Sequence, residues 1–395
     1  MRPVLRPRPS RRPSRRPSRR PAGRTALRPT RGGVTAALAL VLAAALGGCG
    51  FDGVGTADDG HAGASGPAAP PLADVTPLDD VRDWEGEVSA VLPETPVEPV
   101  GDPTPELPVT VTDAQGTEVE VTDVSRVLAL DVYGTLSRTV FELGLGESLV
   151  GRDVSTQFAE AADLPLVTQN GHDLNAEAIL ALDPTLIITD TSLGPWDVML
   201  QMRDSGIPVV VVDSHRGLDN LASLTGEVAT ALGVPGEGEQ LAERVEAEVA
   251  GVTAQIAEVA PTSPGEQLRT VFLYVRGTSG IYYMFGEGSG ADALITAVGG
   301  YDVAEEIGWA GMRPVTDEGI IAAQPELVLM MTDGLDSAGG VDGLLERLPA
   351  LAATPAGESR RFVDMADAQI LGYGPLTAQV LNALAVAVYA PGEVA

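Results

Sequence analysis

Residues 236–259 read GEGEQLAERVEAEVAGVTAQIAEV and hold one helical pattern without an internal proline. A helix of roughly 24 residues is about 36 Å long, because each residue adds about 1.5 Å. That length is enough to bridge two lobes. We therefore expect a rigid bridging helix at residues 235–260, with one lobe before it (108–234) and one after it (261–395).

The two flanking parts of the chain share a repeated pattern. Residues 177–188 (EAILALDPTLII) match residues 318–329 (EGIIAAQPELVL), with glutamate, proline and leucine at a constant offset of 141. Duplication of one structural unit is the simplest explanation of such a match.

Within each part, apolar runs alternate with helix-like segments. Examples in the first part are 126–131 (RVLALD), 186–188 (LII) and 209–212 (VVVV). Continuous apolar strands between helices are typical of parallel sheets covered on both faces. The fold class predicted is α/β, with two Rossmann-like lobes, a joining helix and a cleft between the lobes.

The only cysteine of the 395 residues, Cys49, follows the apolar run 34–46 (VTAALALVLAAAL) and Gly47-Gly48. The run suits a signal peptide and is too short to span a bilayer. We therefore interpret residues 1–48 as a basic leader with a lipoprotein signal peptide, and Cys49 as the lipidated first residue of the mature chain. The alternative is a buried lone cysteine.

Residues 1–33 contain twelve of the 25 basic residues and no acidic one. A twin-arginine export signal or a start codon placed too far upstream explains them equally well. The remaining chain carries 13 arginines against 55 acidic residues, which argues against a nucleic-acid partner or an anionic membrane surface. Gly, Ala, Pro and acidic residues dominate 49–107, so we expect a disordered acidic tether there.

Two segments carry candidate binding chemistry. His172 lies in the polar loop NGHDLN (170–175), at the end of an α/β sheet where ligands bind. The alternative is a capping or solvated histidine.

Tyr274 lies on the strand TVFLYV (270–275), and Arg276 follows directly after that strand. The two residues are two positions apart, so their side chains share one face of the strand. A neighbouring arginine favours the phenolate, which is a known axial ligand of haem iron. The alternative is a tyrosine packed at a sheet edge.

From about residue 109 onward the chain resembles the substrate-binding proteins of iron-siderophore, haem and cobalamin ABC importers, a class III, helical-backbone type of periplasmic binding protein. Within that class it is most similar to the haem-binding lipoproteins of high-GC Gram-positive haem importers. The specific matches are the segments 171–175 (GHDLN), 274–277 (YVRG) and 311–314 (GMRP).

The resemblance implies roles for individual residues. His172 and Tyr274 would be the two axial ligands of haem iron, one from each lobe, with Arg276 supporting the tyrosine. Glu177 and Glu318 would dock onto arginines of the permease. The alternative for both glutamates is a favourable position in the first turn of a helix.

Other residues are weaker candidates for the pocket. Tyr133 follows the first strand of its lobe, and we group it with Arg152, Trp309 and Met312 as possible pocket residues. His215 follows the strand 209–212 and is placed either at the cleft or in a turn. No Ser-His-Asp set or metallohydrolase motif stands out.

The function predicted is a cell-surface haem receptor, without catalysis, that delivers hemin to an ABC permease and its ATPase. We expect a monomer on the outer face of the cell membrane, attached by its lipid alone. The alternatives are a ferric-siderophore or cobalamin receptor of the same class, and a surface haem sensor or relay without a permease.

Overall fold

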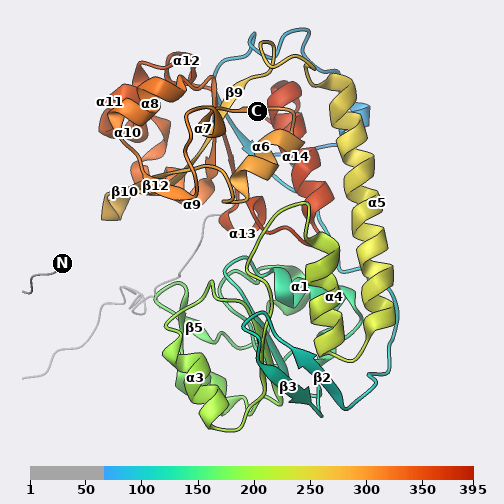
Figure 1. Cartoon of the computed structure of the whole chain (residues 1–395). Helices are drawn as coiled ribbons and strands as arrows, with labels where there is room; N and C mark the ends of the chain where they lie inside the picture. Colours follow the sequence, from blue (N-terminus) through green and yellow to red (C-terminus); the bar gives the residue numbers. More distant parts are fainter. Residues whose placement is uncertain (1–65) are drawn as a thin grey trace, which may run out of the picture. The chain divides into compact units, whose positions relative to one another are not determined.

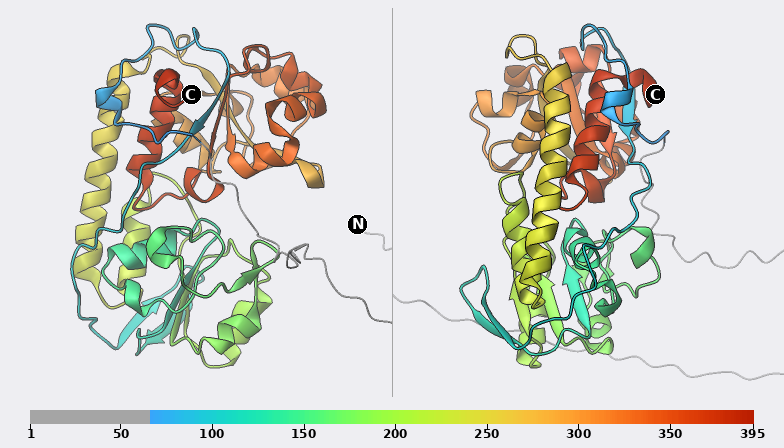
Figure 2. Two further views of the ribbon diagram at one scale, coloured as in Figure 1. Left: turned by 180° about the vertical axis from the view of Figure 1, so that it is seen from behind. Right: turned by 90° about the vertical axis from the view of Figure 1, so that its right-hand side faces the viewer.

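The computed structural model describes residues 66–395 (Figures 1 and 2). The leader, the signal peptide, Cys49 and the first part of the predicted tether lie outside the described residues. Within the described part of the chain, no helix combines the length and apolarity needed to cross a membrane.

The bridging helix α5 spans Pro235–Val259, as the sequence predicts. It packs against α4 (Leu221–Ala231) at one end and α14 (Thr377–Tyr389) at the other (Figure 1). The buried residues recur every three or four positions and so form one apolar stripe. They are Gly238, Leu241, Val245, Val249, Val252 and Ile256.

The N-terminal lobe is built on a parallel sheet with the strand order β4–β7–β8. Its strands are fully buried, which agrees with their continuous apolar sequence. An antiparallel hairpin of β2 and β3 stands at the start of the lobe. The elements are β2 (Val109–Thr112), β3 (Glu118–Val121), β4 (Val127–Leu130), α1 (Thr135–Glu142), β5 (Thr168–Gln169), β6 (Asp173–Leu174), α2 (Ala176–Ala181), β7 (Leu186–Thr189), α3 (Asp197–Asp204) and β8 (Val209–Val211).

The C-terminal lobe has a seven-stranded sheet in the order β1–β14–β13–β9–β10–β12, with β11 beside β9. It is mixed rather than wholly parallel, because β10 and β12 run antiparallel to their neighbours. Its strands are β9 (Arg269–Arg276), β10 (Ile281–Phe285), β11 (Tyr301–Asp302), β12 (Met312–Pro314), β13 (Leu327–Met331) and β14 (Phe362–Met365). Its helices are α6 (Ala291–Ala297), α7 (Val303–Glu306), α8 (Asp317–Ala323), α9 (Thr332–Ala338), α10 (Gly340–Arg347), α11 (Pro349–Ala352), α12 (Pro355–Glu358) and α13 (Asp367–Ile370).

The prediction of a disordered tether is wrong for residues 66–107. Strand β1 (Glu87–Ala90) pairs in parallel with β14 and forms an edge of the C-terminal sheet. Trp84, Val88 and Leu92 are buried in the main core. The segment's overall composition is polar. Its few large apolar residues are nevertheless spaced so that a strand can bury them against an existing sheet. Composition alone does not reveal that spacing.

After β1 this segment crosses to the N-terminal lobe (Figure 2). The Arg138 guanidinium of α1 donates hydrogen bonds to the carbonyls of Thr95 and Pro96 at 2.9 and 2.8 Å. Arg244 of α5 donates to the Glu98 carbonyl at 2.6 Å. Residues 91–107, here called the strap, therefore form a second connection between the lobes beside α5.

Candidate functional site

His172 is held at the tip of a small hairpin in the N-terminal lobe. Strands β5 and β6 pair Thr168 with Leu174 and Gln169 with Asp173. Asn170 and Gly171 both adopt positive φ angles, 49° and 86°, which suit an Asn-Gly loop. The loop therefore fixes the half-buried His172 just before β6, at the end of the lobe from which α2 begins.

Tyr274 lies near the end of β9 in the C-terminal lobe. Its ring stacks on Phe285 of β10 with a centroid separation of 5.8 Å, and Phe285 stacks on Phe272 at 5.2 Å. Residues two apart on a strand share a face, and Phe272 and Tyr274 indeed contact the same hydrophobic cluster. The phenol is therefore supported by a rigid aromatic stack.

Arg276 covers the Tyr274 ring and is held there by an acidic partner. Its guanidinium carbon lies 4.5 Å from the ring centroid, a cation–π distance. The same group donates to the Val275 carbonyl at 2.9 Å and to Asp367 Oδ2 at 2.8 Å. The predicted pairing of Tyr274 with Arg276 is present, and Asp367 fixes its geometry.

Asp367 begins α13 and was not among the residues selected from sequence. Its other carboxylate oxygen accepts the backbone N–H of Asp333 at 3.0 Å. Burial raises the pKa of Asp367, while the charge of Arg276 opposes that rise. A sequence clue existed, because Asp367 stands two residues beyond β14, at the ligand end of the sheet.

The N-terminal lobe presents a second tyrosine–arginine pair. The Arg216 guanidinium lies 5.4 Å from the centroid of the Tyr133 ring. It also donates to Asp190 Oδ2 at 2.6 Å and reaches Asp131 Oδ2 at 3.5 Å. Burial raises the pKa of Tyr133, an effect that Arg216 reduces. Sequence reasoning selected Tyr133 and missed Arg216, which follows His215 in the loop after β8.

Two buried carboxylates, Asp131 and Asp190, share the Arg216 guanidinium, and a third buried carboxylate, Asp153, joins them through the backbone. Asp153 accepts hydrogen bonds from the backbone N–H groups of Asp131, Ser155 and Thr156. Burial and the neighbouring carboxylates Asp153 and Asp190 raise the pKa of Asp131 to about 7. Burial likewise raises the pKa of Asp153 to about 6. The ends of β4 and β7 and the loop after β8 are thus tied together by one buried polar network.

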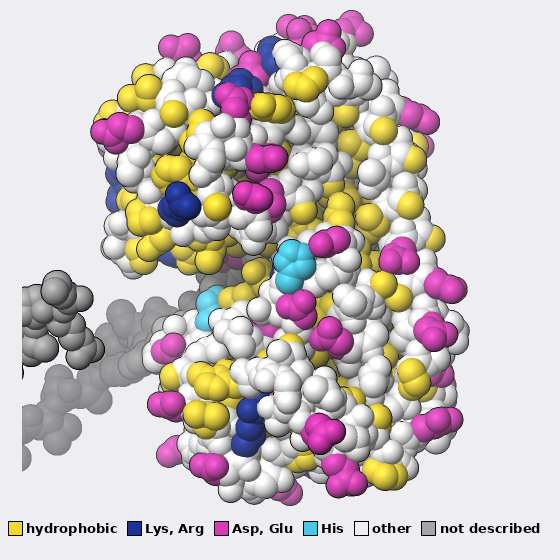
Figure 3. Space-filling view, in the orientation of Figure 1, with side chains coloured by type: hydrophobic (Ala, Val, Ile, Leu, Met, Phe, Trp, Pro, Cys, Tyr) yellow, Lys and Arg dark blue, Asp and Glu magenta, His cyan; other side chains and the backbone are white. Residues whose placement is uncertain are grey.

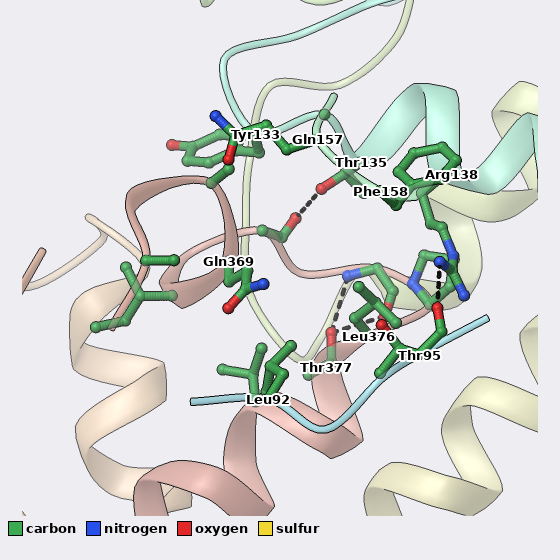
Figure 4. A pocket seen from close by; sticks show the side chains of 18 of the residues that line it. Leu92, Thr95, Tyr133, Thr135, Arg138, Gln157, Phe158, Gln369, Leu376 and Thr377 are labelled. Atoms are coloured by element: carbon green, nitrogen blue, oxygen red, sulfur yellow. Dashed lines mark hydrogen bonds between the residues drawn. The ribbon is translucent and has the colours of Figure 1, made fainter. Parts of the chain in front are cut away.

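A cavity of about 590 Å³ lies between the lobes (Figure 4). Its size is within the ordinary range of ligand pockets, about 300–1,000 Å³. Three parts of the chain form its walls: both lobes and the strap. The labelled side chains are Tyr133, Thr135, Arg138, Gln157 and Phe158 of the N-terminal lobe, Gln369, Leu376 and Thr377 of the C-terminal lobe, and Leu92 and Thr95 of the strap.

One direct hydrogen bond crosses between the lobes at this cavity. The Thr135 hydroxyl donates to the Gly372 carbonyl at 2.7 Å (Figure 4). Helix α13 links the cavity to the Tyr274 region, because Asp367 holds Arg276 while Ala368 and Gln369 line the cavity wall. Tyr133 is the only one of the predicted site residues that lines this cavity among the described residues.

The remaining pocket candidates are scattered. The Arg152 guanidinium donates to the carbonyls of Asp153 and Thr156 at 3.3 Å, within its own lobe. The Trp309 indole donates to the Met284 carbonyl at 2.9 Å. Met312 is 63% exposed. A role of these three residues in ligand binding stays a prediction.

His215 lies in the irregular loop after β8, where its Nε2 lies 2.9 Å from Asp219 Oδ1. Figure 3 shows both histidines of the described chain on the edge of the N-terminal lobe that faces the other lobe. Glu177 and Glu318 are both exposed, on α2 and α8 respectively.

The family model for periplasmic binding proteins matches residues 132–368, which is more than half of the chain. The chain belongs to the periplasmic binding protein family. The two-lobed α/β architecture with a bridging helix, expected from the sequence, is therefore confirmed.

Among solved structures, a heme binding protein is closely similar. The heme binding protein HmuT is 41% identical, with a TM-score of 0.73 over 78% of this chain and 99% of that chain. HmuT variants with one arginine, one histidine or one tyrosine replaced by alanine match comparably. The periplasmic heme-binding protein RhuT from Roseiflexus sp. RS-1 is 37% identical, with a TM-score of 0.61 over 68% of this chain and 99% of that chain.

Two curated relatives are more distant. The ABC transporter substrate-binding lipoprotein YvrC of Bacillus subtilis, itself uncharacterized, is 23% identical over 71% of this chain and 86% of that protein. A cobalamin-binding protein of Halobacterium salinarum is 25% identical over 58% of this chain and 61% of its own length.

The match with HmuT extends beyond the two lobes and the bridging helix, into the part of the chain that contains β1 and the strap. Residues 108–395 make up about 73% of the chain, whereas HmuT structures match up to 80% of it. The similarity therefore includes part of the chain before residue 108. This agrees with the packing of β1 and the strap against the two lobes.

Proposed function

We propose that this protein is a cell-surface receptor that binds hemin between its two lobes and delivers it to an ABC permease. The observation that carries the proposal is the Tyr274–Arg276–Asp367 arrangement, found in a fold that the heme binding protein HmuT matches over 99% of its length. Tyrosine, arginine and histidine are also the residue types replaced in the HmuT variants.

In this proposal the phenolate oxygen of Tyr274 and an imidazole nitrogen of His172 bind the ferric iron from opposite lobes. Arg276 stabilises the negative charge on the phenolate, and Asp367 keeps Arg276 over the ring. Further affinity comes from burying the apolar macrocycle between the lobes. Two protein ligands occupy both axial positions of the iron, which suits carriage rather than catalysis.

Release requires the lobes to separate. Helix α5 and the strap both connect the lobes, and the Thr135–Gly372 hydrogen bond joins them directly. These connections keep the opening small, so the permease must supply the free energy that separates the lobes.

Absorbance titration of the protein with hemin tests the proposal. The wild-type protein gives a Soret band of bound haem at a stoichiometry of one per chain, and His172→Ala shifts this band. The matched control is His215→Ala, which removes the other histidine of the described chain and leaves the spectrum unchanged. A wild-type titration without saturable binding refutes the receptor role.

A cobalamin receptor is the second candidate, and the cobalamin-binding relative favours it. A ferric siderophore brings its own iron ligands and needs no protein tyrosine. Parallel titrations with cyanocobalamin and a ferric siderophore distinguish these cargoes from hemin.

The transport role requires two further features. We propose that Glu177 and Glu318, one exposed on each lobe, pair with arginines of the permease, and that acylated Cys49 attaches the monomeric protein to the outer face of the membrane. A crosslink from Glu177→Cys or Glu318→Cys to the permease supports transport. A haem sensor or relay gives no such crosslink.

A further inference from the structure

The helices that carry Glu177 and Glu318 are structural copies of each other. Each begins after a capping side chain that accepts backbone N–H groups of the first turn, Asn175 for α2 and Thr316 for α8. These caps keep the offset of 141 residues.

The ends of the two helices keep the same offset. Asp183 and Gln324 both have left-handed backbone conformations, with φ angles of 47° and 44°. A proline follows each of them, and then a buried strand, β7 or β13. The two helices therefore present their side chains in equivalent ways on the two lobes.

Each copy also exposes one large aliphatic side chain, three residues after its glutamate. Leu180 is 38% exposed and Ile321 is 57% exposed, while the preceding Ile179 and Ile320 are buried. Residues three apart lie on the same side of a helix. Each exposed aliphatic group is therefore next to its glutamate on the outer surface.

This repetition argues against a chance exposure. Isolated exposed aliphatic residues are common on protein surfaces. Here, however, two of the seven large hydrophobic residues exposed in the described chain occupy equivalent positions of the duplicated unit. Neither α2 nor α8 needs this side chain for its own packing, because the neighbouring isoleucine already anchors each helix.

We propose that Leu180 and Ile321 form, with Glu177 and Glu318, two matched contacts for two equivalent permease subunits. Each contact accepts an arginine at the glutamate and an apolar side chain at the aliphatic residue. The strongly acidic chain favours a basic partner surface, and a duplicated contact fits a two-fold partner. The inference rests on the proposed function, since it requires docking to a permease.

Binding of the haem-loaded protein to the haem permease–ATPase complex in lipid nanodiscs tests this inference. We expect Leu180→Ser and Ile321→Ser each to weaken binding about tenfold, which is about 1.4 kcal/mol. The double variant should be about a hundredfold weaker, because distant sites act additively. Leu78→Ser is the control, since Leu78 is comparably exposed and lies beside the end of α14 rather than on α2 or α8.

Salt dependence separates the two kinds of contact. The losses caused by Glu177→Ala and Glu318→Ala should shrink at high salt, because salt screens exposed charges. The losses caused by the serine variants should persist. Hemin titration of each variant should match the wild type, which shows that folding and the haem site are unaffected.

The outcomes distinguish the two proposals. If the wild-type protein binds the permease and the serine variants bind equally well, the apolar contact is wrong and the receptor role stands. If the wild-type protein binds hemin but never the permease complex, both the docking surface and the transport role are overturned.

Discussion

The guanidinium of Arg276 lies over the ring of Tyr274, 4.5 Å from its centroid, in the C-terminal lobe. The Tyr274 ring also stacks on the ring of Phe285, which holds it in place. An oxygen ligand is most effective when its position is set before the metal arrives. The Tyr274 oxygen is therefore the candidate iron ligand whose position is set before hemin binds.

Replacing Tyr274 by Phe removes the oxygen and keeps the aromatic stack. We expect the Soret band of the hemin complex to shift and the affinity to fall at least tenfold, because one metal bond is lost. The control is Tyr283→Phe, which removes the hydroxyl of the residue that pairs with Tyr274 in the backbone register of β10 and β9. An unchanged spectrum in Tyr274→Phe contradicts the assignment of this ligand.

Replacing Asp367 by Asn weakens the hold on Arg276. The substitution keeps the shape of the side chain, removes its charge and leaves one acceptor oxygen for the two donors, Arg276 and the Asp333 N–H, so the ion pair at 2.8 Å is lost. We expect hemin to bind roughly three to ten times more weakly, about 0.7–1.4 kcal/mol, while the thermal unfolding temperature changes little. Equal hemin affinity in the variant and the wild type rules out this positioning role.

Replacing Arg216 by Met destabilises the protein. The substitution leaves Asp131 and Asp190 buried without their shared cation. Removing one partner of a buried ion pair typically costs about 3–5 kcal/mol, and we expect a loss of roughly 3 kcal/mol in urea unfolding. Arg313→Met, at an exposed arginine, should change the unfolding free energy little. A loss below about 1 kcal/mol, typical of exposed pairs, means that the network contributes little to stability.

The carboxylate network should make stability depend on pH. The folded-state pKa of Asp131, about 7, lies above the ordinary value of 3.8. The folded state therefore holds more protons than the unfolded state between these values, and its stabilisation is lost as pH rises through 7. We expect Asp131→Asn to reduce the stability difference between pH 5 and pH 8 by roughly 1–3 kcal/mol.

Urea unfolding at both pH values measures this effect. The exposed Asp83→Asn serves as the matched control. If Asp131→Asn and Asp83→Asn show the same pH dependence as the wild type, the proton uptake does not occur at Asp131.

Strand β1 should be protected from amide hydrogen exchange. Its residues 87–90 pair with 362–365 of β14, whereas the strap residues 101–105 are irregular. We expect slow exchange in β1 and fast exchange at 101–105, measured by mass spectrometry. Equally fast exchange in both stretches would restore the original prediction of a tether up to residue 107.

The local placement of several candidate site residues could be predicted, because the evidence for that placement is local. The loop sequence Asn170-Gly171-His172 dictates a tight turn, and the two-residue spacing of Tyr274 and Arg276 dictates a shared strand face. The pairing of Asp367 with Arg276 and of Arg216 with Tyr133 could not be found in this way. The partners are far apart in sequence, and only the tertiary structure brings them together.

The sequence by itself determined the long helix α5, the duplicated α/β units and the alternation of buried strands with helices, because periodicity and repeats follow from local geometry. The tertiary structure alone decided that β1 joins the C-terminal sheet, that the strap connects the lobes, and that the buried carboxylates Asp131 and Asp190 share Arg216. These features depend on pairing between distant segments. Such pairing is set by the burial of apolar surface and by the neutralisation of buried charge, and neither leaves a periodic mark in the chain.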